Sequence, residues 1–225
     1  MDSAQTIQQI FESDGFQGLS AQIKVALFLG GMALISAALV TMTAFTRIVS
    51  VLTFVRRALS TQEIPPTQVI LGLSLFLTMF VMGPTLTTIE NDAVRPYLAE
   101  TIDGQTAWKN GSAAIHDFMI RQTRKADIAL FARMAKVSTI QTAQDTPMQV
   151  LIPAYVISEL KTAFIMGFCL YIPFILIDLV VSVILMSLGM MMMPPMVIST
   201  PFKILLFVLV DGWQLIARVL SMSFH

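Results

Sequence analysis

Three ionisable side chains near the end of this 225-residue sequence are candidates for chemistry, namely Asp178, Lys203 and Asp211. All three lie in apolar surroundings, where a charge without a partner is costly. If the chain folds back at the Pro194-Pro195 pair, the two aspartates come level, and Lys203 lies roughly 12 Å from Asp178 along the helix axis. The aspartates could mimic an intramembrane aspartyl protease, and Asp178 with Lys203 could form the relay of an ion-coupled transporter. Such a hairpin does not neutralise itself, which favours charge pairing between subunits.

A second set of charges, Glu159 and Lys161, precedes an apolar stretch. Two residues apart on a helix, they point about 200° away from each other and cannot pair. One alternative is that each pairs with an opposite charge elsewhere in the chain or in another subunit. The other is that both lie at the headgroup level and are solvated.

Cysteine and histidine are too rare for most metal or nucleophilic sites. Cys169 is the only cysteine, and the only histidines are His116 and His225. A metal site needs about four clustered ligands, and a reactive thiol needs a partly exposed, electropositive setting. We therefore predict Cys169 to be a small buried hydrophobe. No Ser/His pairing and no phosphate-binding glycine loop is present, so we expect neither an enzyme nor a cofactor.

Methionine is concentrated in one short stretch, where five of the 16 methionines fall within eight residues. They are Met190, Met191, Met192, Met193 and Met196. Gly189, Pro194 and Pro195 flank the run and are predicted helix breaks. Flexible thioether side chains on an irregular backbone would form a deformable apolar constriction. The alternative is that these side chains face lipid or fill core gaps.

The composition indicates a membrane protein. Only 12% of the residues are charged and 56% are hydrophobic, whereas a soluble domain carries about 25% charge. Lysine plus arginine (14) equals aspartate plus glutamate (14), so no basic surface for nucleic acid is indicated. Sixteen of the 28 charged residues fall between Glu90 and Lys161. This uneven distribution predicts apolar helices on both sides of a polar insert.

We predict an all-α fold with about four long hydrophobic helices, because about 20 apolar residues span a bilayer as a helix. The expected helices lie near residues 25–46, 66–89, 160–188 and 196–217. The expected organisation is an N-terminal segment (1–24), a first hydrophobic hairpin (25–89), a polar helical insert (90–161) and a second hairpin with the methionine-rich loop (162–225). Four helices cannot enclose a pore wide enough for a polypeptide, so a protein channel built from this chain must be oligomeric.

Capping residues and prolines suggest where helices begin and end. Ser112 is a candidate N-cap in the insert, and Thr146-Pro147 has the arrangement that starts a helix leading into the third hydrophobic segment. The Pro65-Pro66 pair and Pro84 are predicted to mark the ends of the second segment. Further prolines recur in the third and fourth segments, as in bent helices that pack in protein or line a cavity. These are Pro153, Pro173 and Pro201.

The charges also predict a topology. The segment between the first two hydrophobic helices carries three arginines against one acid, so the positive-inside rule places it in the cytoplasm. Its charges are Arg47, Arg56, Arg57 and Glu63. The N-terminal segment, residues 90–161 and the tail after Trp213 would then face outward. Residues 1–20 lack a basic region followed by an apolar one, so either a signal peptide has been removed before Met1 or the orientation is reversed.

Four long blocks of the sequence resemble the FliP family of flagellar type III export-gate proteins and their injectisome counterparts, the SctR proteins. The resemblance runs from about Ala26 to Ser221. The blocks are TAFTRIVSVLTFVRRALSTQEIPPTQVILGLSLFLTMFVMGP, IPAYVISELKTAF, LIDLVVSVILMSLGMMMMPP and PFKILLFVLVDGW. The insert, with DFMIRQTRKADIALFARMAKV, resembles the flagellar rather than the injectisome members.

The resemblance implies a helical subunit that assembles as an oligomeric ring, a pentamer, and joins FliQ and FliR in a gate for unfolded flagellar proteins. FlhB and FlhA would be further neighbours, in the flagellar basal body of the bacterial inner membrane with the insert on the periplasmic side. Met190 to Met192 align with the family's methionine gasket, and Met193 takes a position often filled by another apolar residue. Glu159 aligns with a family acid that faces FliQ. An injectisome gate subunit and an ion-coupled transporter remain the alternatives.

Overall fold

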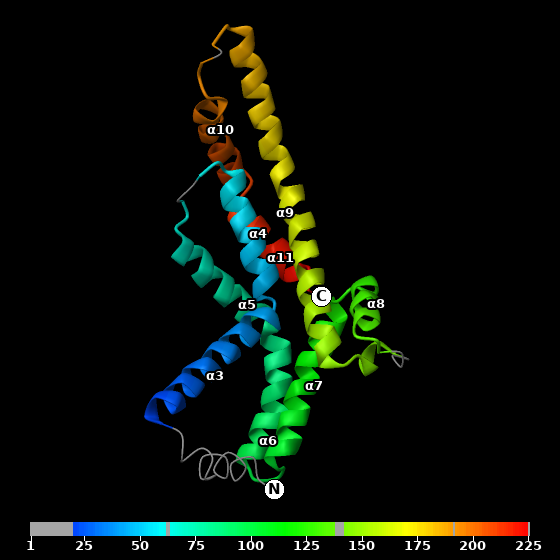
Figure 1. Ribbon diagram of the computed structural model, residues 1–225. Coiled ribbons are helices and arrows are strands. Elements are labelled where there is room, and N and C mark those ends of the chain that lie inside the picture. Colours follow the sequence, from blue (N-terminus) through cyan, green and yellow to red (C-terminus); the bar gives the residue numbers. More distant parts are fainter. Residues whose placement is uncertain (1–19, 62–63, 138–141, 191, 225) are drawn as a thin grey trace. The chain divides into compact units, whose positions relative to one another are not determined.

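The computed structural model describes residues 20–61, 64–137, 142–190 and 192–224, and over these residues the chain is helical without β-strands (Figure 1). The all-α prediction is therefore confirmed. The expectations for residues 1–19, Glu63, Met191 and His225 lie outside the described residues. The α-helices are α3 (Ala21–Thr41), α4 (Phe45–Ala58), α5 (Thr67–Ile89), α6 (Arg95–Leu98), α7 (Gly104–Gln122), α8 (Lys125–Met134), α9 (Met148–Ser187), α10 (Pro195–Leu209) and α11 (Gly212–Met222).

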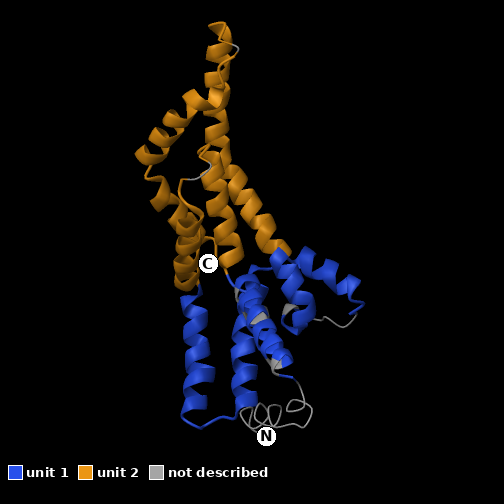
Figure 2. Ribbon diagram, turned by 60° about the vertical axis from the view of Figure 1, so that its left-hand side comes forward, with its two compact units in different colours: residues 1–43, 82–156 blue, residues 44–81, 157–225 orange. Residues whose placement is uncertain are grey.

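Contacts divide the chain into two compact units, coloured in Figure 2. Unit 1 comprises residues 1–43 and 82–156, and unit 2 comprises residues 44–81 and 157–225. Both α5 and α9 contribute residues to the two units. The four segments predicted from the sequence were divided by hydropathy and not by contacts. They therefore stay a prediction.

The first predicted hydrophobic helix is shorter than residues 25–46, because α3 ends at Thr41 and α4 begins at Phe45. Helix α4 is amphipathic, with buried Ile48, Val51, Leu52 and Val55 at helical spacing. Arginines 56 and 57 fall in its last turn, where cations favourably meet the helix dipole. The segment predicted to face the cytoplasm is thus largely this helix.

Helix α5 begins directly after the Pro65-Pro66 pair, as predicted. Pro84, however, lies inside the helix, so the prediction that it marks the end is wrong. A proline removes only one backbone hydrogen bond of the ladder, and the chain continues through one π-helical turn (Glu90–Val94) into α6. The resulting helical stretch from Thr67 to Leu98 contains 32 residues.

The insert is mostly helical, but α7 begins earlier than the sequence suggested. Its N-cap is Asp103, whose carboxylate accepts a hydrogen bond from the Thr106 backbone N–H at 3.2 Å. Hydrogen bonds from Thr106 also lower the pKa of Asp103, which keeps the cap charged. Ser112 lies inside α7 and donates to the Lys109 carbonyl, so the prediction that it caps a helix is wrong.

Unit 1 has a small core where α7 meets the first two turns of α9. The rings of Phe118 and Tyr155 make an edge contact with centroids 6.2 Å apart. The Tyr155 hydroxyl donates to the Thr43 carbonyl at 2.9 Å, after α3 ends. His116 Nε2 lies 2.8 Å from the carbonyl of Thr146, just before α9. These bonds connect the beginning of α9 with the segment after α3, and α7 with the segment before α9.

Helix α9 spans 40 residues and begins at Met148, directly after Thr146-Pro147, which confirms the helix start predicted there. The hydrophobic segment expected from residue 160 is the continuation of this helix. Two prolines, Pro153 and Pro173, lie within it. Both α9 and the stretch from Thr67 to Leu98 are long and apolar enough to cross a membrane. The beginning of α9, up to Val156, belongs to unit 1, and the rest of the helix belongs to unit 2.

The fourth predicted helix, 196–217, is broken into α10 and α11, which are bent by 64°. Asp211 takes a left-handed backbone conformation at the break, with φ of 51°. Gly212 follows, and a Cβ there would lie 2.3 Å from the ring of Phe207. That ring also contacts Trp213, with centroids 5.2 Å apart. The bend is therefore fixed by close packing of a ring against a glycine.

Candidate functional site

The methionine-rich turn joins α9 to α10 in unit 2. Helix α9 ends in a Schellman motif: the Met190 N–H donates to the Leu185 carbonyl at 2.9 Å and the Gly189 N–H to the Met186 carbonyl at 3.1 Å. Gly189 has a φ of 76°, which glycine adopts without steric cost. Pro194 precedes α10 and Pro195 is its first residue. Gly189 and Pro194 therefore lie between the two helices, and Pro195 begins the second one.

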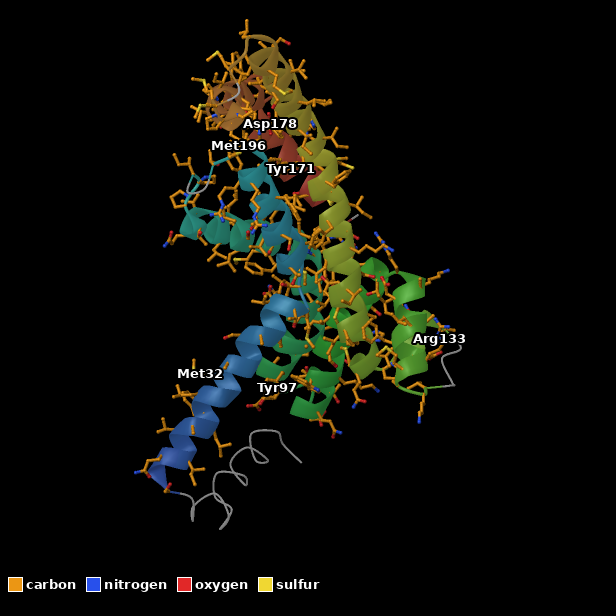
Figure 3. All side chains as sticks on the ribbon, turned by 45° about the horizontal axis from the view of Figure 1, so that its top comes forward. Met32, Tyr97, Arg133, Tyr171, Asp178 and Met196 are labelled. Atoms are coloured by element: carbon orange, nitrogen blue, oxygen red, sulfur yellow. The ribbon has the colours of Figure 1, made fainter. Side chains whose placement is uncertain are left out.

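The methionine side chains of this turn are largely uncovered within the single chain. Exposed fractions are 40% for Met190, 99% for Met192, 40% for Met193 and 58% for Met196. Figure 3 marks Met196 at the start of α10 and Asp178 on α9.

A polar cluster of four residues ties this hairpin together. Lys203 Nζ donates to Asp178 Oδ2 at 2.6 Å and to Ser60 Oγ at 2.7 Å. Ser199 Oγ donates to Asp178 Oδ1 at 2.6 Å. Lys203 and Ser199 are fully buried, whereas the Asp178 side chain keeps 30% of its surface exposed. We call Ser60, Asp178, Ser199 and Lys203 the Asp178 cluster.

The prediction that this hairpin does not neutralise its own charge is wrong. Asp178 pairs with Lys203 because the chain turns at Gly189, not at the Pro194-Pro195 pair, so the facing register shifts by several residues. For the same reason Asp178 is not level with Asp211, which lies exposed at the bend between α10 and α11. The two aspartates do not form a protease-like pair within this chain.

A second buried ion pair joins α4 to α9. Arg47 Nε donates to Glu159 Oε2 at 2.9 Å, and Arg47 Nη2 donates to Glu159 Oε1. Arg47 is 2% exposed and Glu159 is 0% exposed. Arg47 Nη1 also donates to the Ser223 carbonyl at 2.8 Å, and the guanidinium carbon lies 3.9 Å from the centroid of the Phe224 ring. This bidentate pair therefore also holds the C-terminal segment.

Glu159 is thus neither solvated nor without a partner, since its partner is Arg47 of the same chain. Lys161 is exposed, and no ion pair within 4 Å is found for it among the described residues. Contacts of these charges with other subunits stay a prediction. Cys169 is exposed, so its predicted burial within the chain is wrong. Hydropathy could not show which face of the apolar α9 the chain itself covers.

Sequence reasoning missed four members of these clusters. The sequence indicates Arg47 only as a topology charge, and it gives no signal for Ser60, Ser199 and Ser223. A signal was available for Arg47, because it lies four residues from Val51 and so faces the same side of the helix as buried apolar residues. Nothing in the local sequence distinguishes these three serines from other serines in or beside helices.

The described residues include no group of three or more His, Cys, Asp or Glu side chains that could hold a metal ion. Together with the apolar α5 and α9, the two buried ion pairs define a helical, membrane-associated protein whose charges serve packing between helices.

Comparison with known proteins narrows this class. A model of the FliP family matches residues 28–220. The flagellar biosynthetic protein FliP of Pectobacterium carotovorum subsp. carotovorum is 49% identical over 212 residues, covering 94% of this chain and 82% of that protein. The protein of the same name from Bacillus subtilis (strain 168) is 48% identical over 215 residues, covering 96% and 97%. That of Aquifex aeolicus (strain VF5) is 43% identical, covering 94% and 89%. The chain therefore belongs to the FliP family of flagellar biosynthesis proteins.

Proposed function

We propose that this chain is a core subunit of the flagellar type III protein export gate. In this proposal it assembles with FliQ and FliR into the channel through which unfolded flagellar proteins leave the cytoplasm. FlhB and FlhA are neighbours, and the assembly lies in the flagellar basal body at the bacterial inner membrane. The observation that carries the proposal is family membership over almost the whole chain, with relatives named for flagellar biosynthesis.

Self-association is part of the proposal, with a ring of five copies as the expected form. A single chain leaves large aromatic side chains uncovered on its apolar helices. On α5 the exposed fraction is 74% for Phe76 and 72% for Phe80, and on α9 it is 63% for Phe168. Apolar surface of this extent is typical of contact with protein partners or lipid. Neighbouring subunits and bilayer lipid would share it.

The flagellar assignment is preferred to an injectisome gate because the relatives described above are named flagellar biosynthetic proteins and are matched over 82%, 97% and 89% of their lengths. No enzymatic activity is proposed, since the family is one of flagellar export components. An ion-coupled transporter is the weaker alternative. The acid and base of its supposed relay are already joined by a 2.6 Å contact that uses both groups in holding helices together.

Native mass spectrometry of the detergent-extracted complex tests the assembly. We expect several copies of this chain together with FliQ and FliR. A chain with the Phe76→Ser and Phe80→Ser changes in the uncovered α5 surface is extracted in parallel. The copies and partners recovered with it are compared with those of the wild type. Recovery of the wild-type chain only as a monomer without partners would contradict the proposal.

Thiol labelling tests the topology. A single cysteine placed at Gln105 in the insert of a Cys169→Ser chain should react with an impermeant reagent from the periplasmic side of cells with an intact inner membrane. The reason is that the arginines of α4 should stay in the cytoplasm. A cysteine replacing Arg57 serves as the control and should react only after the inner membrane is opened. The reverse pattern would overturn the orientation.

A further inference from the structure

We infer that the Asp178 cluster is a positioning device that fixes the register of α10 against α9 and thereby sets the position of the methionine-rich turn. This inference rests on the proposed function, in which that turn lies in an export channel. The cluster comprises the two charged residues and two serines that connect α9, α10 and the end of α4.

The register of this hairpin needs a specific contact because its facing surfaces are otherwise apolar. Apolar side chains gain similar contact energy in several offsets, whereas a buried polar contact is satisfied in only one. Between the cluster and the turn the helices do not pack closely. An apolar groove of about 560 Å³ runs between them from the level of the cluster toward the turn, and its lining includes Leu176, Val180 and Ile184 on α9 and Ile198 and Phe202 on α10.

Among the described residues, the turn supplies one long backbone contact between its two sides, from the Met193 N–H to the Met190 carbonyl at 3.4 Å. Its other backbone hydrogen bonds run back to the end of α9, from Leu188, Gly189 and Met190. The Val197 N–H bonds only to Pro194 at the beginning of α10. Because the other backbone hydrogen bonds of the described turn residues stay within one side of the hairpin, the turn follows the helices that carry it. A shift of α10 would therefore move the methionines.

The cluster is also anchored outside the hairpin. Ser60 follows α4 and has a φ of 57°, a conformation that non-glycine residues adopt only when neighbouring contacts support it. The Lys203 ammonium bonds to its hydroxyl at 2.7 Å, at the helix end where the dipole favours a cation. One lysine thus connects α10 with both α9 and α4. The hairpin is positioned relative to the rest of unit 2 and not only closed on itself.

The two charged residues of the cluster differ in burial. This difference determines which substitutions can remove the cluster. Lys203 is 0% exposed, so loss of Asp178 alone would leave an ammonium buried without its counter-ion. Asp178 keeps 30% of its side chain exposed and can recruit water if Lys203 is lost. A variant that replaces both charges avoids the unpaired lysine and changes the register contact with the least effect on folding.

A reversible cross-link tests the inference. The Asp178→Cys, Ser199→Cys and Lys203→Met changes are combined in a Cys169→Ser chain, and the full gate complex is reconstituted into vesicles loaded with a small dye. The two thiols replace side chains whose oxygens lie 2.6 Å apart. We expect several-fold faster dye loss than wild type when the thiols are reduced. Loss should return close to the wild-type rate after oxidation by dipyridyl disulfide, which couples thiols and leaves thioethers intact.

Controls separate this inference from the proposed function. In the two single-cysteine variants, the rate of dye loss should be the same before and after oxidation. A gate with alanines in place of Met190 and Met192 should leak in both redox states if the turn seals the channel. If that gate leaks while the cross-linking variant holds dye equally in both states, the positioning role is wrong. Loss of the complex in both states would also overturn it, since the cluster would then be needed for assembly and not for position.

Discussion

Replacing Arg47 by Ala is expected to destabilise the chain by about 3–5 kcal/mol, because it leaves the Glu159 carboxylate buried without its counter-ion. Both side chains are almost fully buried, and the guanidinium makes two of its hydrogen bonds to this one carboxylate. Arg47 also donates to the backbone of Ser223. The change should therefore loosen the last turn of α11 in addition to the α4–α9 contact.

The measurement is the free energy of unfolding of the purified chain in mixed micelles, supported by its abundance in cells. Arg57→Ala is the matched control, since Arg57 is an exposed arginine on the same helix. A surface change of this kind costs within about 0.5 kcal/mol. An Arg47→Met and Glu159→Gln double variant should recover much of the loss, because neither charge is then left alone. Equal effects of Arg47→Ala and Arg57→Ala would contradict the structural role.

The same pair refines what a change at Glu159 can show about FliQ. Glu159→Lys would place a second cation beside Arg47, so the chain itself should become less abundant. The amount of FliQ recovered must therefore be divided by the amount of folded chain before variants are compared. If Glu159 also contacts FliQ, as we propose from the family resemblance, recovery per folded chain should fall. Unchanged recovery would restrict Glu159 to its bond with Arg47.

Hydropathy predicted the fold class and one helix closely, because long uncharged runs leave few alternatives to a helix. Helix α5 occupies Thr67–Ile89, almost the predicted range. Local breaking signals were less reliable. Pro84 does not end its helix, whereas Asp211 and Gly212 do break the last one. At the second break the Gly212 backbone is packed against the ring of Phe207, five residues earlier, and this contact cannot be recognised from the glycine alone.

The site shows the same division between local and tertiary information. The residue types of the charges were sufficient to select Glu159, Asp178 and Lys203 as candidates. Their partners were not predictable, because the register of a hairpin depends on which residue makes the turn. A shift from Pro194 to Gly189 changes every facing pair along α9 and α10. The exposure of Cys169 was likewise hidden by the uniform apolarity of its helix.

Replacing Met190, Met191 and Met192 together by Ala should make the assembled gate leak ions and small dyes. Around a symmetric axis, each copy would contribute the same thioether side chains to one ring. Such a ring would form a dry constriction that ions enter only at a large desolvation cost. Shorter alanine side chains would widen it. Met192 is 99% exposed in the single chain, so its truncation removes no contact on which the fold of one copy depends.

Leucine at the same three positions is the matched control. It keeps an apolar side chain of similar volume, so the resting gate should hold its permeability barrier near the wild-type level. Leucine is branched and lacks the flexible thioether, which adapts to surfaces of different shape. We therefore expect the leucine variant to remain tight at rest but to export flagellar proteins more slowly. Both properties are measured in cells that express the complete gate, by dye uptake and by the amount of secreted flagellar protein.

The competing view is that these methionines face lipid and fill no channel. On that view the alanine variant would assemble at normal abundance and keep the wild-type barrier, because lipid closes around a shorter side chain. The turn's exposure in one chain is compatible with either environment, but only a ring on the channel axis couples side-chain length to ion leakage. A tight alanine variant at normal complex abundance would therefore end the gasket hypothesis. A leaking alanine variant beside a tight leucine variant would establish side-chain volume as the seal.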